Sequence, residues 1–170
     1  MTMTPEFSRV VRLEQLSPKP WRQRIEATPD ERESLCSRFE LVSLDRLTAM
    51  VKLTRESGAV IRLEASFEAE FVQSCAVTVE PVAGTISDRF SLLYGPPEKE
   101  PQHISSNVDE PAFEPLVGET IDIGEAVAQE LSLALPLFPR HTDSSMEIEF
   151  AETPIESPFA ALGRLRRTDE

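Results

Sequence analysis

Residues 59–71 alternate between apolar and polar side chains over thirteen positions, a period that fits a β-strand and not a helix. The apolar positions share one face, and the charged positions, which include Glu64, share the other. The stretch 46–53 alternates in the same way, and Ser57 and Gly58 between the two stretches supply a turn. The sequence therefore predicts an antiparallel hairpin with one dry face and one solvated face.

Two start signals predict helices on either side of this hairpin. Thr28 can accept a hydrogen bond from the N–H of Glu31 while the Glu31 carboxylate reaches back to the N–H of Thr28, so a helix is predicted over 29–40. Asp122 is a predicted N-cap, with Glu125 at the reciprocal third position, ahead of apolar residues that recur every four positions. Both helices would therefore begin at a defined side chain.

The rest of the chain supplies shorter elements and one segment of a different kind. Strands are predicted over 7–13, 85–94 and 146–150, and a short basic helix over 158–166. Residues 95–118 hold five prolines and five acidic residues, so this stretch is expected to be a mobile acidic insert. The 170 residues are expected to form a single α+β domain. Its antiparallel sheet of about five strands could curl like a barrel, with about three helices on its dry face.

Charge is distributed unevenly along this chain. Residues 67–156 hold 18 acidic and 3 basic residues, whereas residues 1–66 are nearly balanced. Such a block repels phosphate and anionic lipid and attracts basic proteins. Glu64, Glu68 and Glu70 lie on the predicted solvated face of the sheet, where they are either a charged surface or a docking site. We expect them to bind a basic protein partner.

One short cluster of aromatic and basic residues indicates a different partner, RNA. Trp21, Arg22 and Arg24 could contact RNA by stacking and by phosphate binding, although a tryptophan that anchors the loop before the first helix is the alternative. The helix predicted over 158–166 could add Arg164, Arg166 and Arg167. Through Phe159, Leu162 and Leu165 the same helix is expected to pack back on the sheet, with a detachable interaction helix as the alternative.

The sequence gives little indication of a phosphate-binding loop, a metal site or a catalytic site. The glycines are too scattered for a phosphate-binding loop. Cys36, Cys75, His103 and His141 are isolated from one another, so free thiols and no metal or cofactor are expected. A hydrolase that uses paired carboxylates stays open, because acidic residues are plentiful. No apolar run is long enough for a membrane helix and no secretion signal is visible, so a cytoplasmic location is expected.

Three motifs, in the same order, resemble the YceD family of bacterial proteins. They are Val79-Glu-Pro-Val82 after the long strand that ends in Cys75, Ile121-Asp-Ile123 with a run that ends in Leu135-Pro136, and Ser157-Pro-Phe-Ala-Ala-Leu162. The resemblance covers roughly residues 7–166. It implies a role in the accumulation of large-subunit ribosomal RNA, and no enzymatic activity is established for the family.

The chain departs from the family pattern at one point. Many members have Cys-x-Arg-Cys in the middle motif, whereas this chain has Cys75-Ala-Val-Thr78. The arginine and the second cysteine are missing, so Cys75 inherits no metal role from the resemblance.

Together these observations predict a cytoplasmic, non-catalytic accessory factor in large-subunit biogenesis. It would support 23S rRNA accumulation by binding a basic ribosomal or assembly protein through Glu64, Glu68 and Glu70. Direct rRNA binding through Trp21 and the neighbouring arginines is the alternative, and a carboxylate hydrolase is the less favoured one. No cofactor, metal, membrane or small-molecule substrate is expected. The identity of the partner and the oligomeric state stay open.

Overall fold

A computed structural model describes residues 5–97, 111–116 and 118–141. A five-stranded sheet has the order β2-β3-β4-β5-β6, and β1 and β7 pair in a separate two-stranded sheet. The strands are β1 Val10–Arg12, β2 Trp21–Glu26, β3 Ser43–Arg55, β4 Ile61–Ser74, β5 Pro81–Gly95, β6 Ala112–Pro115 and β7 Thr120–Asp122. The helices are α1 Pro29–Phe39 and α2 Ile123–Ala134, and short 3-10 turns lie at η1 Leu13–Gln15 and η2 Ser57–Ala59.

The predicted hairpin is confirmed as β3 and β4, which pair antiparallel across η2. Along β4 every odd position from Ile61 to Phe71 is buried, and the even positions between them are half-buried or exposed. β5 pairs antiparallel with β4 over its whole length, from Pro81 opposite Ser74 to Tyr94 opposite Ile61. These three long strands give the sheet one buried face and one solvated face, as the alternation predicts.

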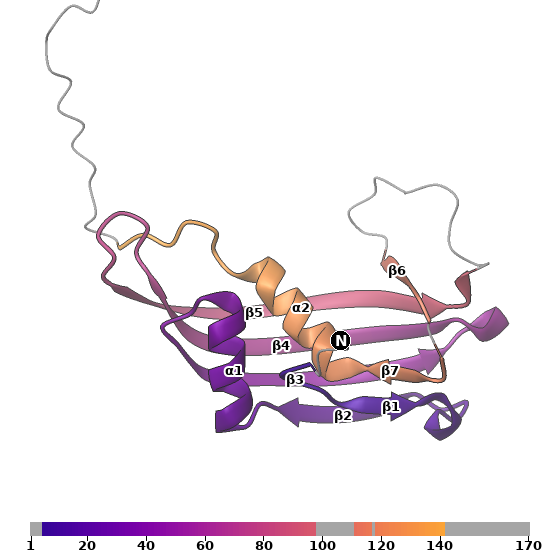
Figure 1. Cartoon of the computed structure of the whole chain (residues 1–170). Helices are drawn as coiled ribbons and strands as arrows, with labels where there is room; N and C mark the ends of the chain where they lie inside the picture. The colour runs from indigo at the N-terminus through magenta and orange to yellow at the C-terminus, as the bar shows by residue number, and fades with distance from the viewer. Residues whose placement is uncertain (1–4, 98–110, 117, 142–170) are drawn as a thin grey trace, which may run out of the picture.

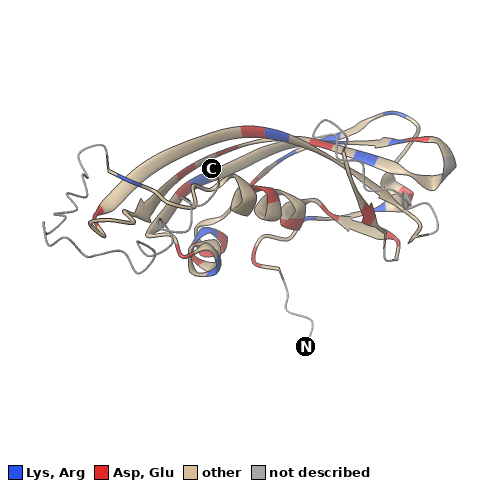
Figure 2. Cartoon of the chain, turned by 90° about the horizontal axis from the view of Figure 1, so that it is seen from above, with Lys and Arg blue, Asp and Glu red and all other residues tan. Residues whose placement is uncertain are grey.

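Both helices and the small sheet lie on the buried face of the five-stranded sheet (Figure 1). Viewed along the sheet, the long strands arch over the helices (Figure 2). Phe7, Leu35 and Leu131 from the covering layer and Phe67 and Leu47 from the sheet have 0–2% exposed surface. Burial of a side chain of this size stabilises the fold by roughly 1.5–3 kcal/mol, so this layer holds the sheet in place.

The local signals for both helix starts are confirmed. Thr28 accepts the N–H of Glu31, and the Glu31 carboxylate accepts the N–H of Thr28. Asp122 accepts the N–H groups of Gly124 and Glu125 at the start of α2. Gly124 is required because a Cβ there would lie 2.5 Å from the Phe7 carbonyl oxygen, which packs against the helix. The start of α2 is thus held directly against the N-terminal segment.

Three features differ from the expectation. The sheet is open and is neither closed nor strongly curled into a barrel, because β2 and β6 form two separate edges. It is mixed, since β6 pairs parallel with β5, and Ala112–Pro115 of β6 belongs to the stretch expected to be an insert. The first predicted strand forms β1 but pairs with β7 outside the main sheet.

Several expected elements lie outside the described residues. They are the strand over 146–150, the helix over 158–166, and most of the insert over 95–118, of which 98–110 and 117 are not described. The described part contains two α-helices. Neither of them is long and apolar enough to cross a membrane.

Candidate functional site

The solvated face of the five-stranded sheet, here called the outer face, is defined by the residues whose side chains alternate with the buried ones on β2 to β5. Strand register places them in rows that cross the sheet, such as Arg22, Lys52, Glu64 and Ser91. Its charged members are Arg22, Arg24, Glu26, Arg46, Lys52, Arg62, Glu64, Glu68, Glu70 and Arg89. No described element covers this face (Figure 2).

The three glutamates predicted to form an acidic docking site all lie on the outer face, but each has a cationic partner. Glu64 Oε2 is 2.6 Å from Lys52 Nζ, its cross-strand neighbour, and this hydrogen bond lowers the pKa of Glu64. Arg46 bonds both remaining glutamates, with N–O distances of 3.3 Å to Glu68 and 3.4 Å to Glu70. Lys52 and Arg46 thus offset two of these three negative charges within the sheet.

The sign of the outer face differs from that of the whole chain. Among the register-paired residues, six are cationic and four are acidic, whereas the chain carries a net charge of −13. Asp45, in the bulge between Leu44 and Arg46, is exposed and is not one of the register-paired residues. The outer face is thus a mixed surface with no excess of negative charge.

Three cations on the outer face have side chains that make no ion pair or hydrogen bond among the described residues. They are Arg22 and Arg24 on β2 and Arg89 on β5, and all three are exposed. In contrast, Arg46, Lys52 and Arg62 are paired with glutamates. Arg22, Arg24 and Arg89 therefore keep their hydrogen-bond donors available to a ligand.

One row of the outer face contains two of these cations, Arg24 and Arg89, and crosses four strands. Arg24 lies opposite Met50, Met50 opposite Ser66, and Ser66 opposite Arg89. Two open hollows of about 470 and 280 Å³ share Met50 and Ser66 in their linings, and Arg89 lines the first and Arg24 the second. With strands about 4.8 Å apart, the two arginines start roughly 14 Å from each other. Met50, 49% exposed, is an apolar contact point between them.

Trp21 does not join this cluster. It pairs with Leu53, whose side chain is 1% exposed, so Trp21 points to the buried face and packs half-buried against the core. The structure thus separates Trp21 from Arg22 and Arg24, which the sequence grouped as one stacking and phosphate-binding site. The strand β2 that separates them was missed, although Trp21, Gln23 and Ile25 alternate with charged residues and could have indicated it.

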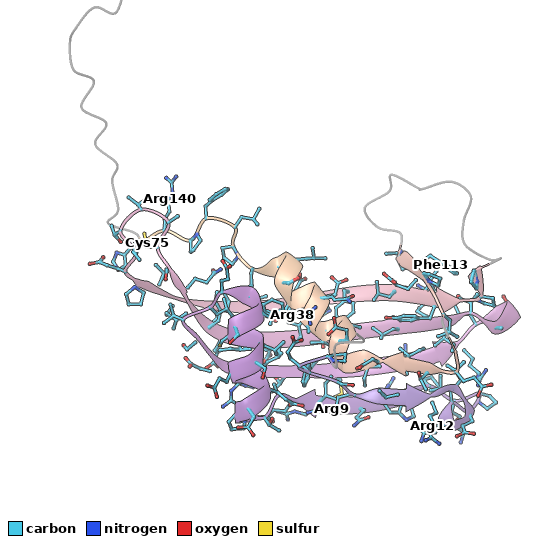
Figure 3. All side chains as sticks on the ribbon, in the orientation of Figure 1. Arg9, Arg12, Arg38, Cys75, Phe113 and Arg140 are labelled. Carbon is cyan, nitrogen blue, oxygen red and sulfur yellow. The ribbon has the colours of Figure 1, made fainter. Side chains whose placement is uncertain are left out.

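Arginines on the helix-covered side have a different environment. Arg9 donates to both oxygens of Glu31 at 2.6 and 2.9 Å, which lowers the pKa of Glu31 to about 2. Arg38 donates to both oxygens of Glu125 at 2.8 and 2.9 Å and to Glu6 at 2.9 Å. Figure 3 shows both arginines close to the covering helices. Glu125 therefore binds α1 to α2 and does not complete a reciprocal cap with Asp122.

Both cysteines are free thiols in different surroundings. Cys75, buried beside the segment that carries Arg140 (Figure 3), accepts hydrogen bonds to Sγ from Thr78, His141 and Val77. These hydrogen bonds, of which those from Thr78 have the largest effect, lower the pKa of Cys75 to about 6. Burial raises the pKa of Cys36. Among the described residues, no three His, Cys, Asp or Glu side chains are grouped as metal ligands would be.

One carboxylate on the other side of the sheet bears on the hydrolase alternative. Burial raises the pKa of Glu130 on α2, and the charges of Asp88 and Glu114 raise it further. Glu130 lines neither hollow of the outer face. Glu130 therefore supplies no general acid to either of these hollows, and a raised pKa by itself does not make a substrate site.

Comparison with known protein families finds a match. Residues 63–166 match the family described as large ribosomal RNA subunit accumulation protein YceD. The matched range is more than half of the chain and includes most of β4 and all of β5, β6, β7 and α2. No curated protein and no solved structure matches the chain.

Proposed function

Since this chain belongs to the YceD family of large ribosomal RNA subunit accumulation proteins, we propose that it is a cytoplasmic, non-catalytic factor that supports 23S rRNA accumulation by binding rRNA through its outer face. Family membership supports the role in rRNA accumulation. The charges of the sheet support the mode of contact.

The observation that supports this contact is a difference in ion pairing on the outer face. Its three glutamates already form ion pairs, whereas three of its arginines do not in the part of the chain that the structure describes. Glu64, Glu68 and Glu70 already bind two cations of the same sheet, which reduces their attraction for a basic protein. Arg22, Arg24 and Arg89 are exposed and bind no acid among the described residues. Guanidinium groups bind phosphate with paired donors, and such contacts provide most of the affinity of proteins for nucleic acids.

The negative charge of the chain does not prevent this contact. Salt at physiological concentration screens charges beyond about 8 Å, so a local basic row can act while acids elsewhere are screened. The row also lacks an aromatic side chain, because Trp21 packs on the opposite side. The outer face would therefore bind the phosphates of rRNA, with little stacking on its bases.

The test is a binding titration of large-subunit rRNA fragments at several salt concentrations. In the triple variant Arg22→Gln, Arg24→Gln, Arg89→Gln, the negative slope of log affinity against log salt concentration should become shallower by about 2–3. Each lost phosphate contact removes about 0.7–0.9 from the magnitude of this slope. The control is Arg12→Gln, Lys19→Gln, Arg140→Gln, which removes the same charge from exposed positions off the outer face. Equal affinities and slopes for the two triples would reject the proposed contact.

A second candidate function keeps the basic ribosomal or assembly protein as partner. The sequence segments 98–110 and 142–156 together hold nine acidic residues and one lysine, a density that attracts cationic proteins. The test is capture of ribosomal proteins from extract at low salt by the full chain and by a chain with these nine acids changed to amides. A loss of captured basic proteins only in the amide variant would favour this partner over direct rRNA binding.

A further inference from the structure

Large apolar side chains are exposed at the C-terminal end of α2. Leu133 is 79% exposed, Leu137 is 87% exposed and Phe138 is 76% exposed, all within six residues. Apolar clusters of this kind on a protein surface mark sites that another segment or protein covers. These three side chains are here called the apolar patch, and of the three only Leu137 also lines the hollow described next.

A hollow of about 470 Å³ lies at the same end of the molecule. Its lining comes from the end of α1 with Phe39 and Glu40, the end of β4 with Gln73, and the segment after α2 with Leu135 and Leu137. Figure 1 shows the segment after α2 running toward the turn between β4 and β5. The Ala76 N–H binds the Pro139 carbonyl oxygen at 2.8 Å and fixes this segment against that turn. The hollow therefore has a defined wall with apolar and acidic groups.

The end of the described chain suggests what covers this hollow. Pro139 lines it, and the described residues end two positions later at His141. Residues 157–165 follow after a connection, 142–156, that can extend to about 50 Å at ~3.3 Å per residue. An attached segment has an effective concentration near the millimolar range, well above that of most separate partners.

The composition of this segment matches the hollow. Phe159, Leu162 and Leu165 recur every three positions, which places them on one side of a helix. Arg164 in this segment is a cation, and Glu40 is the acidic residue that lines the hollow. The family match extends to residue 166, so the segment belongs to the same family unit as β4 and α2.

We propose that residues 157–165 dock as a helix in this hollow and cover the apolar patch. Phe159, Leu162 and Leu165 would face Leu137 and Phe138. The proposal does not depend on rRNA binding, because the hollow and the outer face share no lining residue.

Hydrogen exchange measured by mass spectrometry on the full chain tests this docking. We expect amides in 157–165 to exchange at least about tenfold more slowly than in an unstructured chain, at all protein concentrations. The double variant Leu137→Ser, Phe138→Ser should remove this protection. The control Val10→Ser, which changes another exposed apolar residue on β1, should leave it unchanged.

A second variant keeps the test valid if the first one fails to fold. The double variant Phe159→Ser, Leu162→Ser changes residues outside the described core. It should speed up amide hydrogen exchange in both 157–165 and 133–138. Unprotected amides in 157–165 of the wild-type chain would overturn the proposal. Protection that rises with protein concentration would also overturn it, because a second copy would then be the occupant of the hollow.

Discussion

The two faces of the central sheet use the same residue type in different ways. On the helix-covered side, Arg9 and Arg38 each bind a carboxylate with two nitrogens and connect elements that are far apart in sequence. On the outer face, Arg22, Arg24 and Arg89 bind no acid among the described residues. Strand register and helix packing, and not charge count, therefore decide which arginines are available to a partner.

The strongest test of the helix-covered side is Asp122→Ala. Asp122 Oδ1 accepts the N–H groups of Arg9, Gly124 and Glu125 at 2.7, 3.1 and 3.1 Å, and Oδ2 accepts the Ser8 hydroxyl. Loss of the cap costs about 1 kcal/mol, and unsatisfied part-buried donors add about 1–2 kcal/mol. We expect the free energy of unfolding in urea to fall by about 2–3 kcal/mol.

The control for this change is Glu119→Ala, which removes the same charge three residues earlier from an exposed side chain. It should change the free energy of unfolding by no more than about 0.5 kcal/mol. A similar loss for both variants would mean that charge, and not the bonds of Asp122, governs the stability of this side.

The Arg9–Glu31 pair predicts a dependence of stability on pH. The pKa of Glu31 is lowered from 4.5 to about 2 by the Arg9 hydrogen bond, so the pair stabilises the fold above 4.5 and its contribution is lost as the pH falls toward 2. Since the pair is partly exposed, Glu31→Gln should cost about 1–2 kcal/mol at neutral pH. The difference between wild type and variant in urea unfolding should shrink steadily below pH 4.5.

Glu130 should show the opposite sign and a smaller effect. Burial and nearby acids raise its pKa above 4.5, so its ionised form destabilises the fold, and this cost grows as the pH rises through the raised pKa. Glu130→Gln should therefore stabilise the protein by a few tenths of a kcal/mol at neutral pH. The gain should vanish below pH 4.5, where both states are protonated. A gain that persists in acid would come from packing and not from charge.

Patterns within one segment predicted most of the fold. Period-two alternation found β3 and β4, and side-chain caps found the starts of α1 and α2. The pairing of β1 with β7 was not predicted, because it joins Val11 to Ile121 across most of the chain. The parallel edge strand β6 was also missed, since its four residues include a proline and lie in an acidic context.

The candidate site was harder to predict than the fold for a physical reason. Sequence placed Glu64, Glu68 and Glu70 on the solvated face, as they are, but the neutralising cations come from a neighbouring strand. Arg46 reaches two glutamates because the register places it opposite Glu70 and diagonal to Glu68. Cross-strand partners depend on register, which no single segment of sequence specifies.

The smallest expected stability change belongs to the outer face itself. Arg24 is exposed and has no side-chain bond among the described residues, so Arg24→Gln should alter the free energy of unfolding by less than about 0.5 kcal/mol. Arg9→Gln is the matched change on the covered side and should cost about 1–2 kcal/mol, since it leaves Glu31 without its partner. Thermal and urea unfolding of the two variants provide the comparison. Equal losses would show that Arg24 is a structural residue and would remove it from the proposed rRNA contact.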